Sequence, residues 1–261
     1  MSKILVQASA GFGKSSSIGP ITREDFLKAG IPDTEILGLN PTETFIISCS
    51  NKNLPIPRWK SLYQKAEYAD FILNGKGNLV VTNDAAQVAN LINLVNVNKK
   101  KVVNILLDDT NYVMQDYYMS KALTTGYDVF KKIGAMMGSI FNEMEKVSAS
   151  NKNFIMMAHS EEYKDSNLDT LSYRFKTVGK MVNDYITPEG KFEIVLFGKQ
   201  SLVTIDGRSV VKKQFVTNYD GQYPAKSPIG MFDSLYIPND LGYVLNAVKA
   251  YESSNDPQIN A

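Results

Sequence analysis

The stretch "LVQASAGFGKSSSIG", from Leu5 to Gly19, decides how this sequence is interpreted. A short apolar run, Ile4–Val6, is followed by small residues and glycines, and then by the triplet GKS at 13–15. This order is typical of a buried strand, a phosphate-binding loop and the start of a helix. The glycine pattern G-x-x-G-x-G-K-S is complete except at its first position, where the chain has Ala8.

A loop of this kind can bind phosphate because of its backbone. Successive N–H groups, together with a helix N-terminus, form a cradle for an anion, and glycines let the backbone approach phosphate oxygens closely. The pattern predicts that Lys14 reaches the β- and γ-phosphates and that the Ser15 hydroxyl binds Mg²⁺. The expected nucleotide-binding segment comprises Ser9, Ala10, Gly11, Phe12, Gly13, Lys14, Ser15 and Ser16.

Ala8 is the one position at which the chain departs from the glycine pattern. The first glycine of the pattern lies at the exit of the strand and serves the tight turn. If the φ angle there is positive, alanine costs on the order of 1 kcal/mol, which strains the loop without abolishing it. The alternative is a glycine-rich turn with an exposed lysine. The strand–loop–GKS order favours the nucleotide site.

Composition narrows the class of protein. A chain of 261 residues with 44% apolar side chains can bury a large core, and a net charge of +1 gives no overall attraction to nucleic acid or membrane. Cys49 is the only cysteine and the chain has one histidine, which excludes an internal disulfide and a Cys/His zinc site. Neither a signal peptide nor an apolar run of roughly 18 residues is found. We therefore expect a cytoplasmic protein with one domain at 1–252 and a flexible tail at 253–261.

Strands and helices alternate over the first 160 residues. Strands are expected at 4–6, 44–50, 102–109 and 153–159, with an edge strand at 77–83, and helices at 22–30, 84–97 and 125–147. Strands that are apolar on both faces predict a parallel sheet covered by helices. The C-terminal third reads as hairpins, with turns at 199–200 and 206–207 and a last helix capped by Asn239. The expected fold class is α/β, with a mainly parallel central sheet flanked by helices and antiparallel strands in the C-terminal third.

Two further strand ends carry polar residues. "NILLDD" ends in Asp108 and Asp109, and "NFIMMAH" ends in His159. Parallel strands end on the same edge of a sheet, so these side chains should face the same crevice as Lys14. We expect Asp108 to join Ser15 around Mg²⁺, Asp109 to orient or activate the attacking water, and His159 to sense the γ-phosphate. A histidine held by a local hydrogen bond is the equally weighted alternative.

A polar stretch follows, from Ser160 to Lys180. Its second half carries the basic residues Arg174, Lys176 and Lys180 and the aromatic residues Tyr173 and Phe175. We expect a mobile loop, and three interpretations stay open. It is a solvated loop, it reaches a neighbouring subunit's γ-phosphate as an arginine finger does, or it lies along single-stranded DNA.

Seven blocks resemble one family. They are "GFGKSSSI", "TFIISCSNKNLPIPRW", "ILLDDTNYVMQDYYM", "GYDVFKKI", "MMAHSEE", "RFKTVGKMV" and "GMFDSLYIPNDL", in this order. Together they resemble the RecA-like P-loop ATPases of tailed phages, which include the Sak-type single-strand annealing ATPases. The resemblance implies a RecA-like domain that binds ATP and Mg²⁺, forms homo-oligomers and acts on single-stranded DNA in recombination or replication.

The resemblance also carries residue roles. Gly13, Lys14 and Ser15 match the Walker A motif, Asp108 matches Walker B, and His159 matches a polar sensor at a strand end. Lys176 and Lys180 match a segment that acts across a subunit interface. The expected catalytic residues are therefore Lys14, Asp109, His159 and Lys180.

One departure affects the chemistry. RecA-type enzymes place a catalytic glutamate after the second strand, where this chain reads "SCSNKN" at 48–53. This leaves open a nucleotide-binding scaffold with little or no hydrolysis. A small-molecule kinase would want an arginine-rich lid, and the only candidate lid here carries a single arginine, Arg174.

Overall fold

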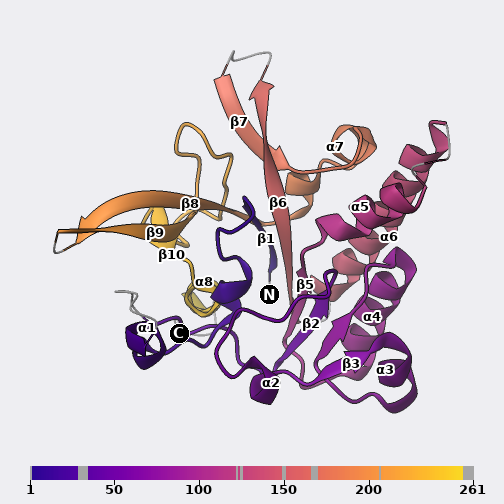
Figure 1. The fold of residues 1–261 in the computed structure, drawn as a ribbon, viewed down its shortest axis with the longest axis horizontal. Helices are drawn as coiled ribbons and strands as arrows, with labels where there is room; N and C mark the ends of the chain where they lie inside the picture. The colour runs from indigo at the N-terminus through magenta and orange to yellow at the C-terminus, as the bar shows by residue number, and fades with distance from the viewer. Residues whose placement is uncertain are drawn as a thin grey trace.

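The computed structural model describes residues 2–28, 35–121, 123, 126–148, 151–165, 170–205 and 207–254. They form a central sheet with helices on both faces (Figure 1). The strands are β1 (Lys3–Ala8), β2 (Thr44–Ser48), β3 (Lys65–Glu67), β4 (Leu79–Val81), β5 (Asn104–Asp108), β6 (Asn153–Asp165), β7 (Thr170–Phe175), β8 (Ile194–Ile205), β9 (Arg208–Val216) and β10 (Tyr236–Pro238). The helices are α1 (Arg23–Lys28), α2 (Trp59–Leu62), α3 (Tyr68–Asn74), α4 (Ala85–Asn98), α5 (Asn111–Ser120), α6 (Asp128–Ser148), α7 (Met181–Tyr185) and α8 (Leu241–Ser254), with 3₁₀ turns η1 (Ser15–Ile18) and η2 (Pro188–Lys191).

The strand order is β10-β9-β8-β1-β6-β5-β2-β4-β3. All neighbours from β8 to β3 run parallel, whereas β8, β9 and β10 pair antiparallel. β7 pairs only with the far half of β6, and this hairpin projects from the body of the protein (Figure 1). The expected fold class is confirmed: an α/β domain with a mainly parallel sheet and antiparallel strands in its C-terminal third.

Each face of the sheet has its own core, because successive side chains of a strand point to opposite faces. Leu5 and Met156 belong to one core, which is shared with the apolar sides of α4 and α6. Val6 and Met157 belong to the other, which is shared with α8 and η1. Since both faces are covered, the strands β1, β2, β5 and β6 contain near-continuous apolar runs, as the sequence suggested.

Several strands and helices differ from expectation. β4 is not an edge strand, because β3 pairs with its outer side. β8 is continuous through Lys199 and Gln200, so the only hairpin turn there joins β8 to β9 around Gly207, whose φ is 75°. The other residue of that predicted turn, 206, lies outside the described residues. β6 continues beyond His159, and α5 follows β5 where no helix was predicted.

The helix ends are partly as predicted. Asp84 caps α4 by accepting a hydrogen bond from the Gln87 N–H, and Thr22 accepts one from the Asp25 N–H before α1. The predicted stop of α1 at 30 and residues 255–261 of the predicted tail lie outside the described residues. The cap of α8 was wrongly assigned to Asn239. Asp240 directly precedes the helix, and its carboxylate accepts from the Gly242 N–H.

Candidate functional site

The loop after β1 has the backbone of an anion-binding turn. Gly11 and Gly13 have φ angles of 78° and 101°, a region that glycine enters without steric cost. Ala8 is the last residue of β1, and its φ is not positive, so the strain considered from the sequence does not arise. Its methyl group fits because the neighbouring strand has Gly198, where a β-carbon would lie 2.6 Å from that of Ala8.

Phe12 is the loop's anchor. Its side chain is fully buried and packs on Phe215 of β9 at a centroid distance of 5.9 Å. A β-carbon at Gly198 would also collide with the Phe12 ring, at 2.6 Å. The loop is therefore fixed to the antiparallel strands by an apolar side chain, and Phe12 can meet a ligand only through its backbone.

The helix expected after the loop is a single 3₁₀ turn. η1 has four residues, and the chain turns away at Gly19 and Pro20. A proline cannot continue a helix, because it lacks the N–H and its ring clashes with the preceding turn. One turn sums few peptide dipoles, so the anion cradle depends on the loop's own N–H groups and on Lys14 rather than on a helix dipole.

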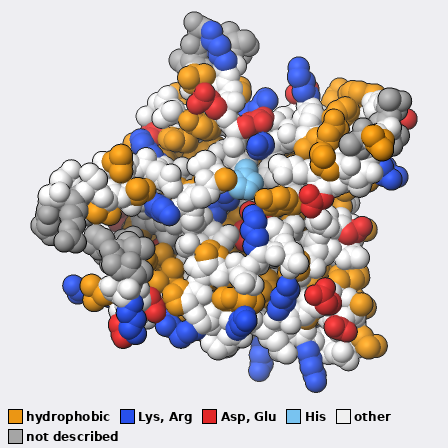
Figure 2. Space-filling view, viewed as in Figure 1, with side chains coloured by type: hydrophobic (Ala, Val, Ile, Leu, Met, Phe, Trp, Pro, Cys, Tyr) orange, Lys and Arg blue, Asp and Glu red, His pale blue; other side chains and the backbone are white. Residues whose placement is uncertain are grey.

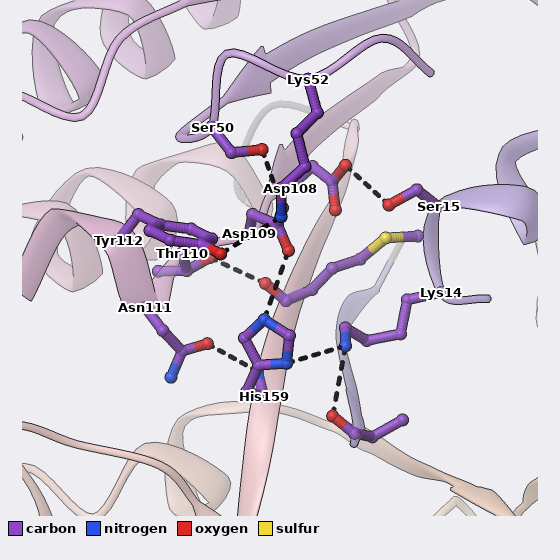
Figure 3. Close-up of polar contacts among 12 residues, drawn as sticks. Lys14, Ser15, Ser50, Lys52, Asp108, Asp109, Thr110, Asn111, Tyr112 and His159 are labelled. Atoms are coloured by element: carbon purple, nitrogen blue, oxygen red, sulfur yellow. Dashed lines mark hydrogen bonds and ion pairs between the residues drawn. The ribbon is translucent and has the colours of Figure 1, made fainter. Parts of the chain in front are cut away.

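Lys14 is the central cation of the site. Its side chain is buried, and Nζ donates hydrogen bonds to the carbonyl oxygens of Ala8 at 3.2 Å and Ser9 at 3.3 Å. Nζ also lies 3.3 Å from Nδ1 of His159 (Figure 3). Burial lowers the pKa of Lys14, and the nearby carboxylates of Asp109 and Asp108 oppose that shift.

Ser15 and Asp108 meet across the sheet edge, although β6 lies between their strands. Ser15 Oγ donates to Asp108 Oδ2 at 3.0 Å, while the buried Oδ1 of Asp108 has no hydrogen-bond partner among the described residues. Burial and the neighbouring Asp109 charge raise the pKa of Asp108 to about 6. An orphaned carboxylate oxygen beside a hydroxyl fits a hard cation such as Mg²⁺, which takes oxygen ligands.

A metal at this position would need ligands from outside the chain. No group of three or more His, Cys, Asp and Glu side chains that could hold a metal occurs within the described ranges. Mg²⁺ is commonly held by one or two carboxylates together with substrate phosphates and waters. The arrangement therefore suits a metal that arrives with a phosphorylated ligand.

Asp109 lies one residue beyond β5 in a left-handed conformation, with φ 55°. Its Oδ2 accepts hydrogen bonds from Ser50 Oγ at 2.8 Å and Lys52 Nζ at 3.3 Å, and its Oδ1 lies 3.6 Å from His159 Nε2. Burial, and then the positive charge of Lys14, lower the pKa of His159. A neutral His159 that accepts from Lys14 at Nδ1 carries its proton on Nε2, toward Asp109.

Asn111, at the start of α5, holds the backbone of His159 in place. Its Oδ1 accepts from the His159 backbone N–H at 2.5 Å, and its Nδ2 donates to the Lys176 carbonyl at 2.5 Å. The Tyr112 ring meets the imidazole edge-on, 6.4 Å away. Sequence reasoning missed both residues because it did not predict α5.

These groups line one open cleft of about 400 Å³. It faces the viewer in Figure 2, where the histidine lies near the centre with basic and acidic side chains beside it. Of the residues expected from the sequence, Ala10, Gly11, Gly13, Lys14, Ser15, Ser16, Asp108, Asp109 and His159 line the cleft, whereas Ser9 and Phe12 do not. The cleft is also lined by Ser50, Lys52, Asn53, Tyr112 and Lys213. Lys52 follows a parallel strand, so the sheet-edge argument could have found it. Lys213 comes from an antiparallel strand, and no sequence signal pointed to it.

The predicted basic residues after His159 do not reach the cleft. The expected loop is wrong for most of the segment, because Ser160–Asp165 pairs with Thr170–Phe175 as the β6–β7 hairpin, and of its described residues only 176–180 form a loop before α7. Arg174 donates to Glu161 at 2.9 Å and stacks over Tyr163 at 4.8 Å. Lys180 is exposed just before α7, and Lys176 touches the site only through its backbone N–H, which donates to the His159 carbonyl at 2.9 Å.

Comparison with known proteins finds similarity to solved structures only. No protein-family model matches the chain, and no curated protein matches it either. Among solved structures, a KaiC-like protein from the hyperthermophilic archaeon Pyrococcus horikoshii is similar at a TM-score of 0.41 and 10% identity, over 87% of this chain and 82% of that one. Within the described ranges, no helix has both the length and the apolar character needed to cross a bilayer.

Proposed function

We propose that this chain is a RecA-like P-loop protein that binds ATP with Mg²⁺ and hydrolyses it. One observation carries the proposal. Lys14 and Ser15 belong to the loop after β1, whereas Asp108 lies 93 residues beyond Ser15 in the sequence, yet all three line one cleft, with the Ser15 hydroxyl 3.0 Å from the Asp108 carboxylate. A buried lysine, a hydroxyl and a carboxylate at the mouth of a glycine-rich loop are the groups that hold a nucleoside triphosphate and its metal.

Each residue has a proposed task. The loop backbone from Ser9 to Ser16 surrounds the phosphates, and Lys14 exchanges its carbonyl partners for phosphate oxygens. Ser15 and Asp108 hold Mg²⁺, which neutralises charge on the β- and γ-phosphates when it is bound. Asp109 orients the attacking water and accepts its proton, and His159 contacts the γ-phosphate while Lys14 holds its ring and Asn111 holds its backbone.

The slow-turnover alternative has its own support. Asp109 is already occupied by Ser50 and by Lys52, whose Nζ also donates to the Tyr112 hydroxyl at 3.2 Å. The described loop after β2 presents Lys52 to the cleft, and the resemblance would place a glutamate in this region. Because these contacts already occupy one oxygen of Asp109, a nucleotide-binding scaffold with little hydrolysis is our second candidate.

A role on single-stranded DNA, in phage recombination or replication, is the finer part of the proposal, and it includes assembly into a homo-oligomer. It is supported by the resemblance and by the β6–β7 hairpin, which projects from the body of the protein and carries Tyr163 and Arg174. Aromatic and basic side chains are suited to stack on bases and meet backbone phosphates.

ATP turnover measured with and without single-stranded DNA tests these possibilities. Stimulation by DNA supports the DNA-dependent ATPase. Tight ATP binding without turnover in either condition supports the scaffold. If ATP neither binds nor is hydrolysed, the proposed function is wrong.

A further inference from the structure

The antiparallel strands β8 and β9 form a wall of the cleft that the P-loop pattern does not predict. Phe12 packs on Phe215 of β9, and Gly198 of β8 leaves room for Ala8. Gln200 Nε2 lies 3.5 Å from the Gly11 carbonyl oxygen. The loop is thus held against these strands at three successive places.

Lys213 lies on this wall and lines the cleft. It is directly across from Gln200 in the β8–β9 ladder, and cross-strand partners share a face of the sheet. It also shares a face with Phe215, two residues on. A β-carbon at Gly13 would lie 3.3 Å from Lys213 Nζ, so the ammonium group is next to the loop backbone.

No carboxylate among the described residues pairs with the ammonium group of Lys213. Lys52 pairs with Asp109, and Lys14 is held by carbonyl oxygens and His159. Lys213 itself forms no hydrogen bond or ion pair within the described part of the chain. Three lysines that line one small cleft repel each other, and a polyanionic ligand would relieve that repulsion.

We propose that Lys213 is a second phosphate-binding lysine of this cleft, supplied by the same chain. It contacts the polyphosphate of the nucleotide from the β9 side, while Lys14 contacts it from within the loop. The inference rests on the proposed nucleotide site and deepens it. It assigns part of the affinity for the polyphosphate to a strand outside the P-loop motif, and it makes this part of the site complete within one protomer.

The chain offers a matched control. Lys212 is the adjacent lysine on β9, exposed like Lys213, but its side chain points to the opposite face and does not line the cleft. Both side chains are exposed, so Lys212→Ala and Lys213→Ala should fold equally well, which thermal unfolding checks.

The test is calorimetric titration with a non-hydrolysable ATP analogue and with AMP. We expect Lys213→Ala to weaken binding of the analogue by about tenfold to a hundredfold, because hydrogen bonds to charged groups are among the stronger ones. AMP affinity should change much less, Lys212→Ala should match the parent, and Lys213→Arg should retain most of the affinity.

Other outcomes separate the two proposals. If Lys213→Ala binds the analogue like Lys212→Ala while Lys14→Ala does not bind, the inference about Lys213 is wrong and the nucleotide site stands. If the parent itself does not bind, the proposed function fails, and the inference fails with it.

A mixing experiment tests whether Lys213 acts within its own chain. Lys14→Ala and Lys213→Ala are combined, and ATP turnover is compared with the sum of the separate variants. A lysine that acts on its own chain's nucleotide gives no recovery. Turnover clearly above the sum means that Lys213 serves a neighbouring protomer, which overturns the inference.

Discussion

The edge of the parallel sheet and the β6–β7 hairpin both contain candidate functional residues, but they arrange their charged side chains differently. At the sheet edge, Lys14, Asp108 and Asp109 are buried within one cleft, and one oxygen of Asp108 has no hydrogen-bond partner among the described residues. On the hairpin, Arg174 and Glu161 face each other in the ladder and pair at 2.9 Å. The sheet edge therefore has buried charged groups that can bind a ligand, whereas these charged side chains of the hairpin pair with each other.

The difference follows from strand direction. Parallel strands end together, so residues that follow different strands are forced into one crevice whether or not their charges suit each other. An antiparallel hairpin places each residue opposite a partner, and selection can match those pairs one by one, as with the Tyr173 hydroxyl and Glu162 at 3.1 Å. Charged side chains that lack a partner of opposite charge therefore indicate the functional site better than charged side chains that are paired.

The largest effect is expected from Lys14→Ala. It removes the buried cation while Asp108 and Asp109 keep their charge, so binding of Mg²⁺·ATP should fall at least a hundredfold and turnover should be lost. The fold should survive, because the side chain's partners are two carbonyl groups and His159. Calorimetry and circular dichroism check the two parts. Unchanged affinity would refute the sheet edge as the ligand site.

Asp109→Asn should separate chemistry from binding. The amide keeps contacts to Ser50 and Lys52 but cannot accept a proton, so turnover should fall by about 10²- to 10⁴-fold while ATP affinity changes little. Steady-state kinetics and equilibrium titration measure the two effects. Loss of binding equal to that in Asp108→Asn would contradict the assignment of different roles to these neighbours.

On the hairpin side of the comparison, Arg174, Lys176 and Lys180 are replaced together by alanine. Single-strand binding should weaken, and its salt dependence should become shallower by about 0.7 per lost phosphate contact. ATP affinity should stay near the parent's, because none of the three lines the cleft. If ATP turnover falls while DNA binding persists, these residues act across an interface. Parental values for both would make the segment a solvated surface.

The smallest effect is a pH-dependent change in stability. The folded-state pKa of Asp108 is raised to about 6, so its contribution to stability is fully present below its unfolded value near 3.8 and is lost as the pH rises through 6. Asp108→Asn resembles the protonated form. Without Mg²⁺ and nucleotide, its melting temperature should exceed the parent's by several degrees at pH 8, with little difference at pH 4. A lower melting temperature at pH 8 would refute this account of Asp108.

The sequence allowed most of the sheet edge to be predicted, because the apolar runs ending at Ala8, Asp108 and His159 follow a simple rule of parallel sheets. It did not allow the hairpin to be predicted. The described residues between Ser160 and Phe175 are mostly polar, and their strands are joined by cross-strand pairs, with Phe175 and Tyr173 making the packing contacts with the core. Lys213 was also missed, since its place depends on how β9 docks on Phe12, a contact between residues 12 and 215.

The 3₁₀ form of the helix after the loop could not be predicted from the sequence either. The pattern at 13–15 predicted a helix whose N-terminus would help to bind the phosphates. Only the structure shows that one 3₁₀ turn remains and that Asn239 supports the loop instead, by donating to the Gly13 carbonyl at 3.0 Å.

The central claim is that the sheet edge binds ATP through Mg²⁺ held by Ser15 and Asp108. Its most direct test is calorimetric titration of the parent protein with the non-hydrolysable ATP analogue, with Mg²⁺ and then with EDTA. We predict saturable binding of one nucleotide per chain that weakens at least tenfold when the metal is removed, and no such metal dependence in Asp108→Asn. Absence of saturable binding, or affinity in the parent that is the same with and without Mg²⁺, would contradict the claim.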